Sequence, residues 1–228
     1  MLDVLKTDKN LPEQAADQIM QLIMDEKLHP GSKLPNEFEL CSMLGVSRTT
    51  VREAVKILSS KNLVEIQRGR GTFVSAKLGV ADDPLGFAFI ENKKKLVADA
   101  LNVRYLLEPA IAEMAAQMAT EEDIKELEDI AAKIEEQIHQ GVNHGDWDSK
   151  FHSKLAYSTK NIILSKMIPV VTQTITLFVS STKAILSQET ITTHRAIIEA
   201  IKARDGKTAR MWMEKHLDMN RDQLKKMF

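Results

Sequence analysis

Apolar residues recur every three or four positions through most of the first 60 residues, and short polar breaks separate the runs. The first run predicts a helix over about 12–27, which ends at the His-Pro-Gly sequence 29–31. A second helix is predicted over 37–44, because Asn36 is a good N-cap and a glutamate follows three residues later. Gly45 then supplies a turn.

A third helix begins after Ser47, which is also a good N-cap. Its inward face repeats apolar residues at helical spacing: Val51, Ala54, Val55 and Leu58. Residues 63–67 and 72–74 have the pattern of two strands, and 68–71 (RGRG) link them. Two short helices joined at a glycine and followed by such a hairpin predict a winged helix-turn-helix, which is a DNA-binding fold.

The outward face of the third helix is polar and basic. It presents Arg48, Thr49, Arg52 and Lys56. Recognition helices place their N-terminal residues at base edges, and an arginine there can pair with guanine O6 and N7. Thr49 and Thr50 suit a phosphate or a thymine methyl group. The alternative is a solvated helix face, but the turn, the cap and the inward stripe all favour DNA binding.

The hairpin link carries the next group of candidate contacts, which are Arg68, Gly69 and Arg70. Glycine lets the backbone approach DNA closely, and the arginines can enter the minor groove or contact phosphate. The whole chain has a net charge of −1, so DNA binding must depend on local charge. Residues 48–77 provide it, with seven basic and two acidic residues.

The rest of the chain has almost entirely helical periodicity, and its low aromatic content of 5% also favours helices. We expect a DNA-binding domain over 1–76, a linker over 77–83 and an all-helical domain over 84–228. The fold class is therefore mainly α, a winged helix-turn-helix followed by an antiparallel helical bundle. The expected helices of the second domain are 84–91, 93–118, 121–140, 146–159, 161–186, 190–204 and 206–227.

Three of the six histidines lie on apolar helical stripes, namely His152, His194 and His216. Asp148 precedes His152 by four residues, so both side chains point the same way. A single inward histidine is more often a hydrogen-bonded core residue than a ligand. Three of them with a carboxylate would be costly to bury unless a shared cation satisfied them. Three nitrogens and one oxygen suit Zn²⁺, and also accept Ni²⁺, Mn²⁺ or Fe²⁺.

Two further features concern the cellular compartment of the protein. Cys41 is the only cysteine, so no disulfide forms within the chain, which fits a reducing compartment. The first ten residues have no apolar run like a signal sequence, and no segment approaches the roughly 20 apolar residues of a membrane span. We therefore expect a cytoplasmic protein without a membrane partner.

The sequence from about residue 11 to 74 resembles the DNA-binding domain of the GntR family of bacterial transcription regulators. The matching motifs are HPGSKLPNEFEL, GVSRTTVREAV and GRGTFV. The resemblance implies operator contacts at Arg48, Thr49, Arg52 and Gly69. Phe38 departs from the pattern, because the family often has a basic or polar residue there.

The second half is similar to the ligand-binding domain of the FadR subfamily, in its metal-containing branch. The motifs are VRYLLEPAIAEMAA, DSKFHSKL followed by Asn161, and HRAIIEAIKARDGKTARMWMEKHL. The resemblance implies that the metal ligands are Asp148, His152, His194 and His216. It also implies a small carboxylate effector, with Arg104 facing the same cavity and Asn161 as a second effector-binding residue. Arg104 has an alternative partner in Glu108 at i+4, and Asn161 an alternative role as a helix cap.

These features together predict a repressor that acts as a homodimer on a palindromic operator and responds to a small organic acid. One alternative is an enzyme that uses the metal to activate water. The sequence offers no strong candidate base, and the DNA-binding module favours sensing. A second alternative is a metal-free regulator that binds an acyl chain, against which the complete Asp/His set argues.

Overall fold

The computed structural model describes residues 9–76, 83–181 and 187–227. The described residues form two compact units that divide between Pro84 and Leu85. The predicted linker, 77–83, lies outside the described residues except for Asp83.

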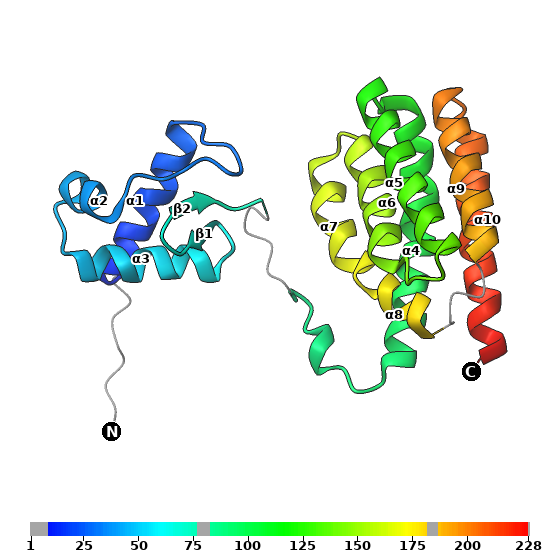
Figure 1. Ribbon diagram of the computed structural model, residues 1–228, viewed down its shortest axis with the longest axis horizontal. Helices are drawn as coiled ribbons and strands as arrows, with labels where there is room; N and C mark the ends of the chain where they lie inside the picture. The colour runs from blue at the N-terminus through cyan, green and yellow to red at the C-terminus, as the bar shows by residue number, and fades with distance from the viewer. Residues whose placement is uncertain (1–8, 77–82, 182–186, 228) are drawn as a thin grey trace. The chain divides into compact units, whose positions relative to one another are not determined.

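The N-terminal unit is the predicted winged helix-turn-helix (Figure 1). Its helices and strands are α1 Leu11–Asp25, α2 Glu37–Leu44, α3 Arg48–Ser60, β1 Val64–Gln67 and β2 Gly71–Val74. The strands pair antiparallel, with Val64 opposite Val74 and Gln67 opposite Gly71. The four apolar residues of the inward stripe on α3 are all buried, in one core with Ile19 and Leu40. Periodicity therefore located this core correctly.

The predicted caps are present as hydrogen bonds. The Asn36 side chain accepts from the N–H groups of Phe38 and Glu39, and the Glu39 carboxylate accepts from the Asn36 N–H. The Ser47 hydroxyl accepts from the Thr50 N–H at the start of α3. Gly45 ends α2 with φ +65°, a left-handed conformation that favours glycine. These local interactions fix the angle of the turn that presents α3.

The C-terminal unit is a helical bundle. Its helices are α4 Lys93–Met118, α5 Glu121–His139, α6 Gly145–Ser158, α7 Ile162–Thr172, α8 Thr174–Ser181, α9 Ser187–Lys202 and α10 Gly206–Met227. Figure 1 shows α4, α5, α6, α9 and α10 side by side along most of their length, while α7 packs on α6. Phe151, Ile197 and Met213 are fully buried in the centre of this core.

Two predicted helices differ from the structure. Residues 84–91 do not form an α-helix, and contain only a 3₁₀ turn, Phe87–Phe89, after Gly86 at φ +67°. The left-handed glycine conformation interrupts helical hydrogen bonding there. The predicted helix 161–186 is interrupted at Gln173, where α7 ends and α8 follows. Residues 182–186 of that prediction lie outside the described residues.

The expectation that no segment approaches a membrane span was too strong. Residues Ile162–Ser180 have the length and apolar composition to cross a membrane. The stretch is divided between α7 and α8, and Pro169 lies inside α7. Ile168, Ile175 and Phe178 are buried in the core of the bundle. These side chains show that one face of the apolar stretch packs inside the C-terminal unit.

Candidate metal centre and nucleic-acid interface

The four predicted metal ligands come from three helices of the C-terminal unit and are all buried. Asp148 and His152 lie one turn apart on α6, His194 lies on α9 and His216 on α10. Each imidazole offers a nitrogen within 4.8 Å of the nitrogens of the other two. Oδ1 of Asp148 lies 3.4 Å from Nε2 of His194. The structure thus brings the four residues into one cluster.

Several atoms of this cluster lack a hydrogen-bond partner among the described residues. They are Oδ1 of Asp148, Nδ1 of His152 and both ring nitrogens of His194. A buried polar group without a partner costs about 1–3 kcal/mol, so this arrangement is unfavourable in itself. A divalent cation accepts lone pairs from a carboxylate and three imidazoles in a common tetrahedral set. The donor chemistry of the cluster therefore fits a metal ion.

The protonation state of two of the imidazoles also fits a metal ion. Burial, followed by the neighbouring imidazoles and Arg104, holds the pKa of His194 well below its usual value. Burial, then His152 and Arg104, lowers the pKa of His216 in the same way. Both rings are neutral at pH 7, and neutral imidazole is the form that ligates metals.

Arg104 pairs with Glu108, its alternative partner, and also lies beside the histidine cluster. Its Nε donates to Oε1 of Glu108 at 2.7 Å and its Nη2 to Oε2 at 3.2 Å. Nη2 also lies 2.9 Å from Nε2 of His152, which makes Arg104 a direct neighbour of the cluster. The buried guanidinium therefore lies at the edge of the candidate metal centre.

Glu108 is a residue to which the sequence analysis gave no role at this site. Its Oε2 lies 2.8 Å from Nδ1 of His152, close enough for an ion pair but without hydrogen-bond geometry. Burial raises the pKa of Glu108, but Arg104 and His152 outweigh burial and hold it well below the usual range. Glu108 is therefore ionised and balances the Arg104 charge. The i+4 spacing from Arg104 was the available signal.

Other neighbours orient the remaining rings. Nδ1 of His216 lies 2.9 Å from the Thr193 hydroxyl, and its Nε2 lies 3.2 Å from the Asn220 amide nitrogen. His144 precedes Asp148 by four residues and is buried, with no partner for Nδ1 in the described part of the chain. Burial lowers the pKa of His144, and Asp148 opposes that shift. The sequence analysis had assigned His144 no function.

Asn161, the second residue connected with an effector, has the capping role. Its side-chain oxygen accepts hydrogen bonds from the N–H groups of Ile163 and Leu164 at the start of α7. The side chain is therefore engaged at a helix terminus.

The predicted DNA-reading residues lie on the exposed side of α3, and acidic residues of the same unit hold several of them. Nε of Arg52 donates to both carboxylate oxygens of Glu37, at 3.0 and 2.9 Å. Arg48 lies 3.6 Å from the same carboxylate. Lys56 pairs with Glu53 at 2.8 Å. These pairs are solvent-exposed and weak, so phosphate or a base edge can replace the carboxylates.

The two predicted threonines have different surroundings. The Thr49 side chain is exposed. The Thr50 hydroxyl lies 2.9 Å from the Ser47 hydroxyl, and its N–H donates to that same cap. Thr50 is thus part of the cap that begins the helix.

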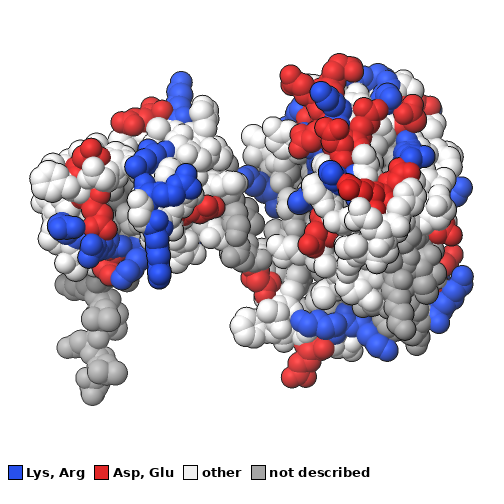
Figure 2. Space-filling model, viewed as in Figure 1, with Lys and Arg blue, Asp and Glu red and all other residues white. Residues whose placement is uncertain are grey.

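The tip of the hairpin is exposed and basic. Arg68, Gly69 and Arg70 lie between β1 and β2, and Gly69 has φ +73°. The Arg70 guanidinium lies 5.6 Å from the centre of the Phe73 ring. Figure 2 shows Lys and Arg side chains gathered over the N-terminal unit, with acidic side chains between them. The unit therefore offers a basic surface at the elements that enter DNA grooves in this fold.

Comparison with known proteins also indicates a DNA-binding protein. The chain matches the family described as bacterial regulatory proteins, gntR family, over residues 11–74, and the FCD domain over residues 99–219. The Uxu operon transcriptional regulator of Escherichia coli is 32% identical over 216 residues, which cover 90% of this chain and 83% of that protein. The galactonate operon transcriptional repressor of Escherichia coli is 30% identical over 201 residues, covering 82% and 85%.

A solved structure described as Streptococcus agalactiae GntR is 38% identical to this chain. It has a TM-score of 0.80 and covers 92% of this chain and 99% of that one. The fold and the two matches define a DNA-binding transcription regulator with an effector-binding domain. The chain belongs to the GntR family of bacterial transcription regulators, in the group that carries an FCD domain. These relatives are regulators, not enzymes, so the hydrolase alternative is wrong.

Proposed function

We propose that this protein is a transcriptional repressor whose operator binding is controlled by a small carboxylate at a divalent-metal site. The observation that carries the proposal is the buried Asp/His cluster, with its unpartnered oxygen and nitrogen atoms. Burying these polar groups without partners is unfavourable, and a bound cation would complete the cluster. Zn²⁺ fits the donor set best, and Ni²⁺ or Mn²⁺ also fits.

The proposed ligands are Asp148, His152, His194 and His216. The bound metal would supply Lewis acidity that attracts the carboxylate of an effector. Arg104 lies beside the cluster and would grip the same carboxylate with its guanidinium. To do so, its Nη2 group would leave His152, while the bond from Nε to Glu108 keeps the side chain in place.

The class of effector follows from this chemistry and from the relatives. A carboxylate is the charge that a metal and an arginine select together. One relative is named as a repressor of the galactonate operon, and galactonate is a sugar acid. We therefore expect a small hydroxy acid or sugar acid, and repression that the acid relieves.

The DNA-binding residues are proposed on the basis of their exposure and the docking geometry of this fold. Arg48, Thr49 and Arg52 would reach base edges in the major groove, while Lys56 would contact phosphate. The remaining contacts would come from Thr50 at the cap and from Arg68, Gly69 and Arg70 in the wing. Glu37 must release Arg48 and Arg52 when DNA binds, so these two contacts form at the expense of exposed ion pairs.

The proposed assembly is a homodimer on a palindromic operator, because a two-fold dimer presents two recognition helices to two equal half-sites. The domain over 1–76 would bind DNA, the domain over 84–228 would bind the effector, and the linker over 77–83 would connect their movements. Effector and operator must then weaken each other's binding by the same factor.

The test begins with selection of an operator from a random-sequence duplex library. Fluorescence anisotropy then measures operator affinity with zinc or with a chelator present, while sugar acids, hydroxy acids, dicarboxylates and acyl compounds are added singly. We expect at least one acid to weaken binding of the wild type and not of Arg104→Ala. Failure to select any sequence would refute the DNA-binding proposal. A response only to acyl compounds, without metal, would assign the protein to the metal-free alternative.

A further inference from the structure

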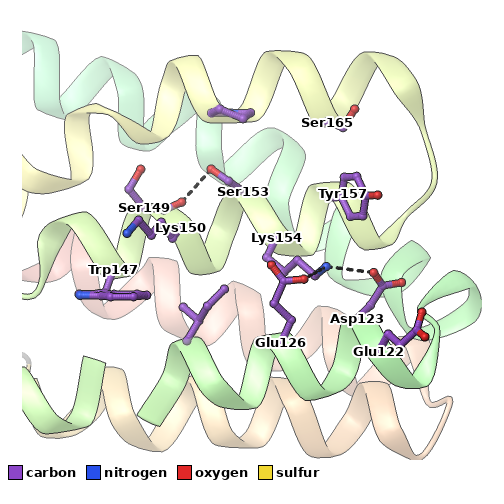
Figure 3. A pocket seen from close by; sticks show the side chains of 12 residues that line it. Glu122, Asp123, Glu126, Trp147, Ser149, Lys150, Ser153, Lys154, Tyr157 and Ser165 are labelled. Carbon is purple, nitrogen blue, oxygen red and sulfur yellow. Dashed lines mark hydrogen bonds and ion pairs between the residues drawn. The ribbon is translucent and has the colours of Figure 1, made fainter. Parts of the chain in front are cut away.

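Helix α6 has two faces with different surroundings. Trp147 and Tyr157 line a groove of about 760 Å³ between α5, α6 and α7, and Figure 3 shows both side chains there. Residues four apart lie on the same face of a helix, so His144, Asp148 and His152 form one stripe on another face. All three side chains of the stripe are buried. Two of them are proposed metal ligands, and His144 is the third member of the stripe.

The ring of His144 has an unsatisfied nitrogen. The residue is 3% exposed, and its Nδ1 has no hydrogen-bond partner within the described part of the chain. A buried polar atom normally has a partner, because leaving it without one is unfavourable. Burial lowers the pKa of the ring, so the imidazole is neutral at pH 7 and offers one donor and one acceptor. Nδ1 can therefore bind a polar group of a molecule that enters the site.

The backbone around His144 is anchored to α8 by the neighbouring residues. The side-chain oxygen of Asn143 accepts from the Gly145 N–H at 2.8 Å, and the Thr176 hydroxyl donates to Oδ1 of Asp146 at 2.8 Å. At Gly145 the chain approaches α8 so closely that a Cβ would lie 2.7 Å from the Cα of Thr176. The position of His144 is thus fixed by its neighbours, while its own Nδ1 makes no hydrogen bond among the described residues.

His144 lies beside the proposed metal ligands but outside their close set. The imidazole nitrogens that lie within 4.8 Å of one another belong to His152, His194 and His216. The His144 ring is still a neighbour of the cluster, because it helps to lower the pKa of His194, and Asp148 acts on the pKa of His144. A side chain in this place is suited to contact a molecule held at the metal site, and not the metal itself.

Arg104 lies at the opposite end of the same stripe. Its Nη2 is 2.9 Å from Nε2 of His152, which is eight residues beyond His144. Eight residues of α-helix rise about 12 Å, at about 1.5 Å per residue. An acid whose carboxylate lies at Arg104 can therefore reach His144 only through groups at some distance from that carboxylate.

We propose that His144 is a specificity-determining residue that hydrogen-bonds a hydroxyl group of the effector, remote from the carboxylate that Arg104 binds. The effector is then a polyhydroxy acid and not an unsubstituted carboxylic acid. A hydroxyl group both donates and accepts, so it pairs with either tautomer of a neutral imidazole. A site built around such a bond rejects a ligand without the hydroxyl, because the buried nitrogen is then left unpaired. This inference rests on the proposed function, which places the carboxylate at Arg104.

The stability of His144→Leu separates this role from a structural one. Leucine fills a similar space, and the nitrogen that it replaces has no partner to lose. In urea unfolding with a chelator and without any acid, His144→Leu should therefore be at least as stable as the wild type. A marked loss of stability would show that His144 holds the core together, and would overturn the inference.

The main test is isothermal titration calorimetry of the zinc-loaded full chain. The probes are galactonate, gluconate and mannonate, each compared with hexanoate, the six-carbon acid without hydroxyl groups. We expect the wild type to bind at least one sugar acid more tightly than hexanoate. In His144→Leu the ratio of the two Kd values should fall about 10-fold, equivalent to about 1.4 kcal/mol.

Two further variants make the comparison specific. His144→Asn places an amide near the position of Nδ1 and should restore most of the ratio. The matched control is Ser153→Ala, on the groove side of α6, where the serine hydroxyl lies 3.2 Å from that of Thr172 (Figure 3). This control should keep the wild-type ratio, because its side chain points away from the proposed metal ligands.

The remaining outcomes distinguish failure of the inference from failure of the proposed function. An unchanged ratio in His144→Leu, or equal weakening of all four acids, would overturn the role of His144 and leave the metal-controlled regulator intact. Loss of zinc from His144→Leu, measured by elemental mass spectrometry, would make His144 a metal ligand and also overturn it. If zinc-loaded wild type bound none of the sugar acids, both the inference and the sugar-acid effector would be wrong.

Discussion

Replacing Glu108 with glutamine should destabilise the C-terminal unit strongly. The Glu108 carboxylate is 1% exposed and accepts two hydrogen bonds from Arg104, which is 3% exposed. Glutamine keeps the size of the side chain but removes the charge, so the guanidinium stays buried without a counter-ion. Breaking a buried ion pair by removing one partner costs about 3–5 kcal/mol. Because His152 still offers Arg104 one acceptor, we expect about 3 kcal/mol.

The assay is urea unfolding at pH 7 with a chelator present, so that bound metal does not add stability. Both tryptophans, Trp147 and Trp212, belong to the C-terminal unit, so their fluorescence follows that unit alone. In thermal unfolding, the same loss should lower Tm by about 6–12 °C. The control is Glu136→Gln, because Glu136 makes an exposed pair with Lys133 and should give no measurable change.

The pH dependence gives a second check on Glu108. Its pKa is depressed in the folded state relative to the ordinary value of 4.5. The stability that the carboxylate contributes is therefore fully present above about pH 4.5 and is lost as pH falls below it. The difference in unfolding free energy between the wild type and Glu108→Gln should therefore become smaller as pH falls below about 4.5. A loss smaller than about 1 kcal/mol at pH 7, or one that grows at lower pH, would refute the reasoning.

Four other substitutions test the DNA and effector sites. Arg52→Ala should weaken binding to a selected operator by about 1–3 kcal/mol and relax preference at one base pair, whereas Lys56→Ala should weaken binding equally on all duplexes. Phe38→Arg replaces an exposed aromatic residue at the start of α2, and should steepen the dependence of log K on log salt by about 0.9 if it gains a phosphate contact. An unchanged slope in a salt titration would place position 38 away from the backbone. Arg104→Lys should abolish the response to carboxylates in thermal-shift assays while metal content stays unchanged.

The N-terminal fold was predictable because its signals are local. Asn36, Gly45 and Ser47 act on residues within one turn of themselves, and the apolar stripe of α3 needs only helical spacing. Helical spacing also predicted that His152, His194 and His216 point inward, and all three are buried.

The contacts around the cluster could not be predicted in the same way. The approach of Arg104 to His152 joins residues 48 positions apart, and that of Thr193 to His216 joins residues 23 apart. Such contacts depend on how the helices pack, which periodicity does not specify. The pairing of Arg52 with Glu37 also crosses from one helix to another. Spacing therefore predicted which residues point inward, but not which atoms meet there.

The errors in helix boundaries also have structural explanations. Residues 84–91 are apolar enough for a helix, but the left-handed backbone of Gly86 interrupts them. The long apolar run after Asn161 was read as one helix, although it is interrupted at Gln173, between α7 and α8. Composition alone could not distinguish one long helix from two shorter ones.

The most direct test of the metal-controlled regulator is the metal content of the protein, purified without a histidine tag and measured by elemental mass spectrometry. The comparison is with Asp148→Ala/His194→Ala and with the control His139→Ala, since His139 is exposed and lies at the end of α5. We predict about one zinc or nickel ion per chain in the wild type and the control, and none in the double variant. Wild-type protein that is free of metal, and that takes up none when zinc, nickel or manganese is added, would contradict the account.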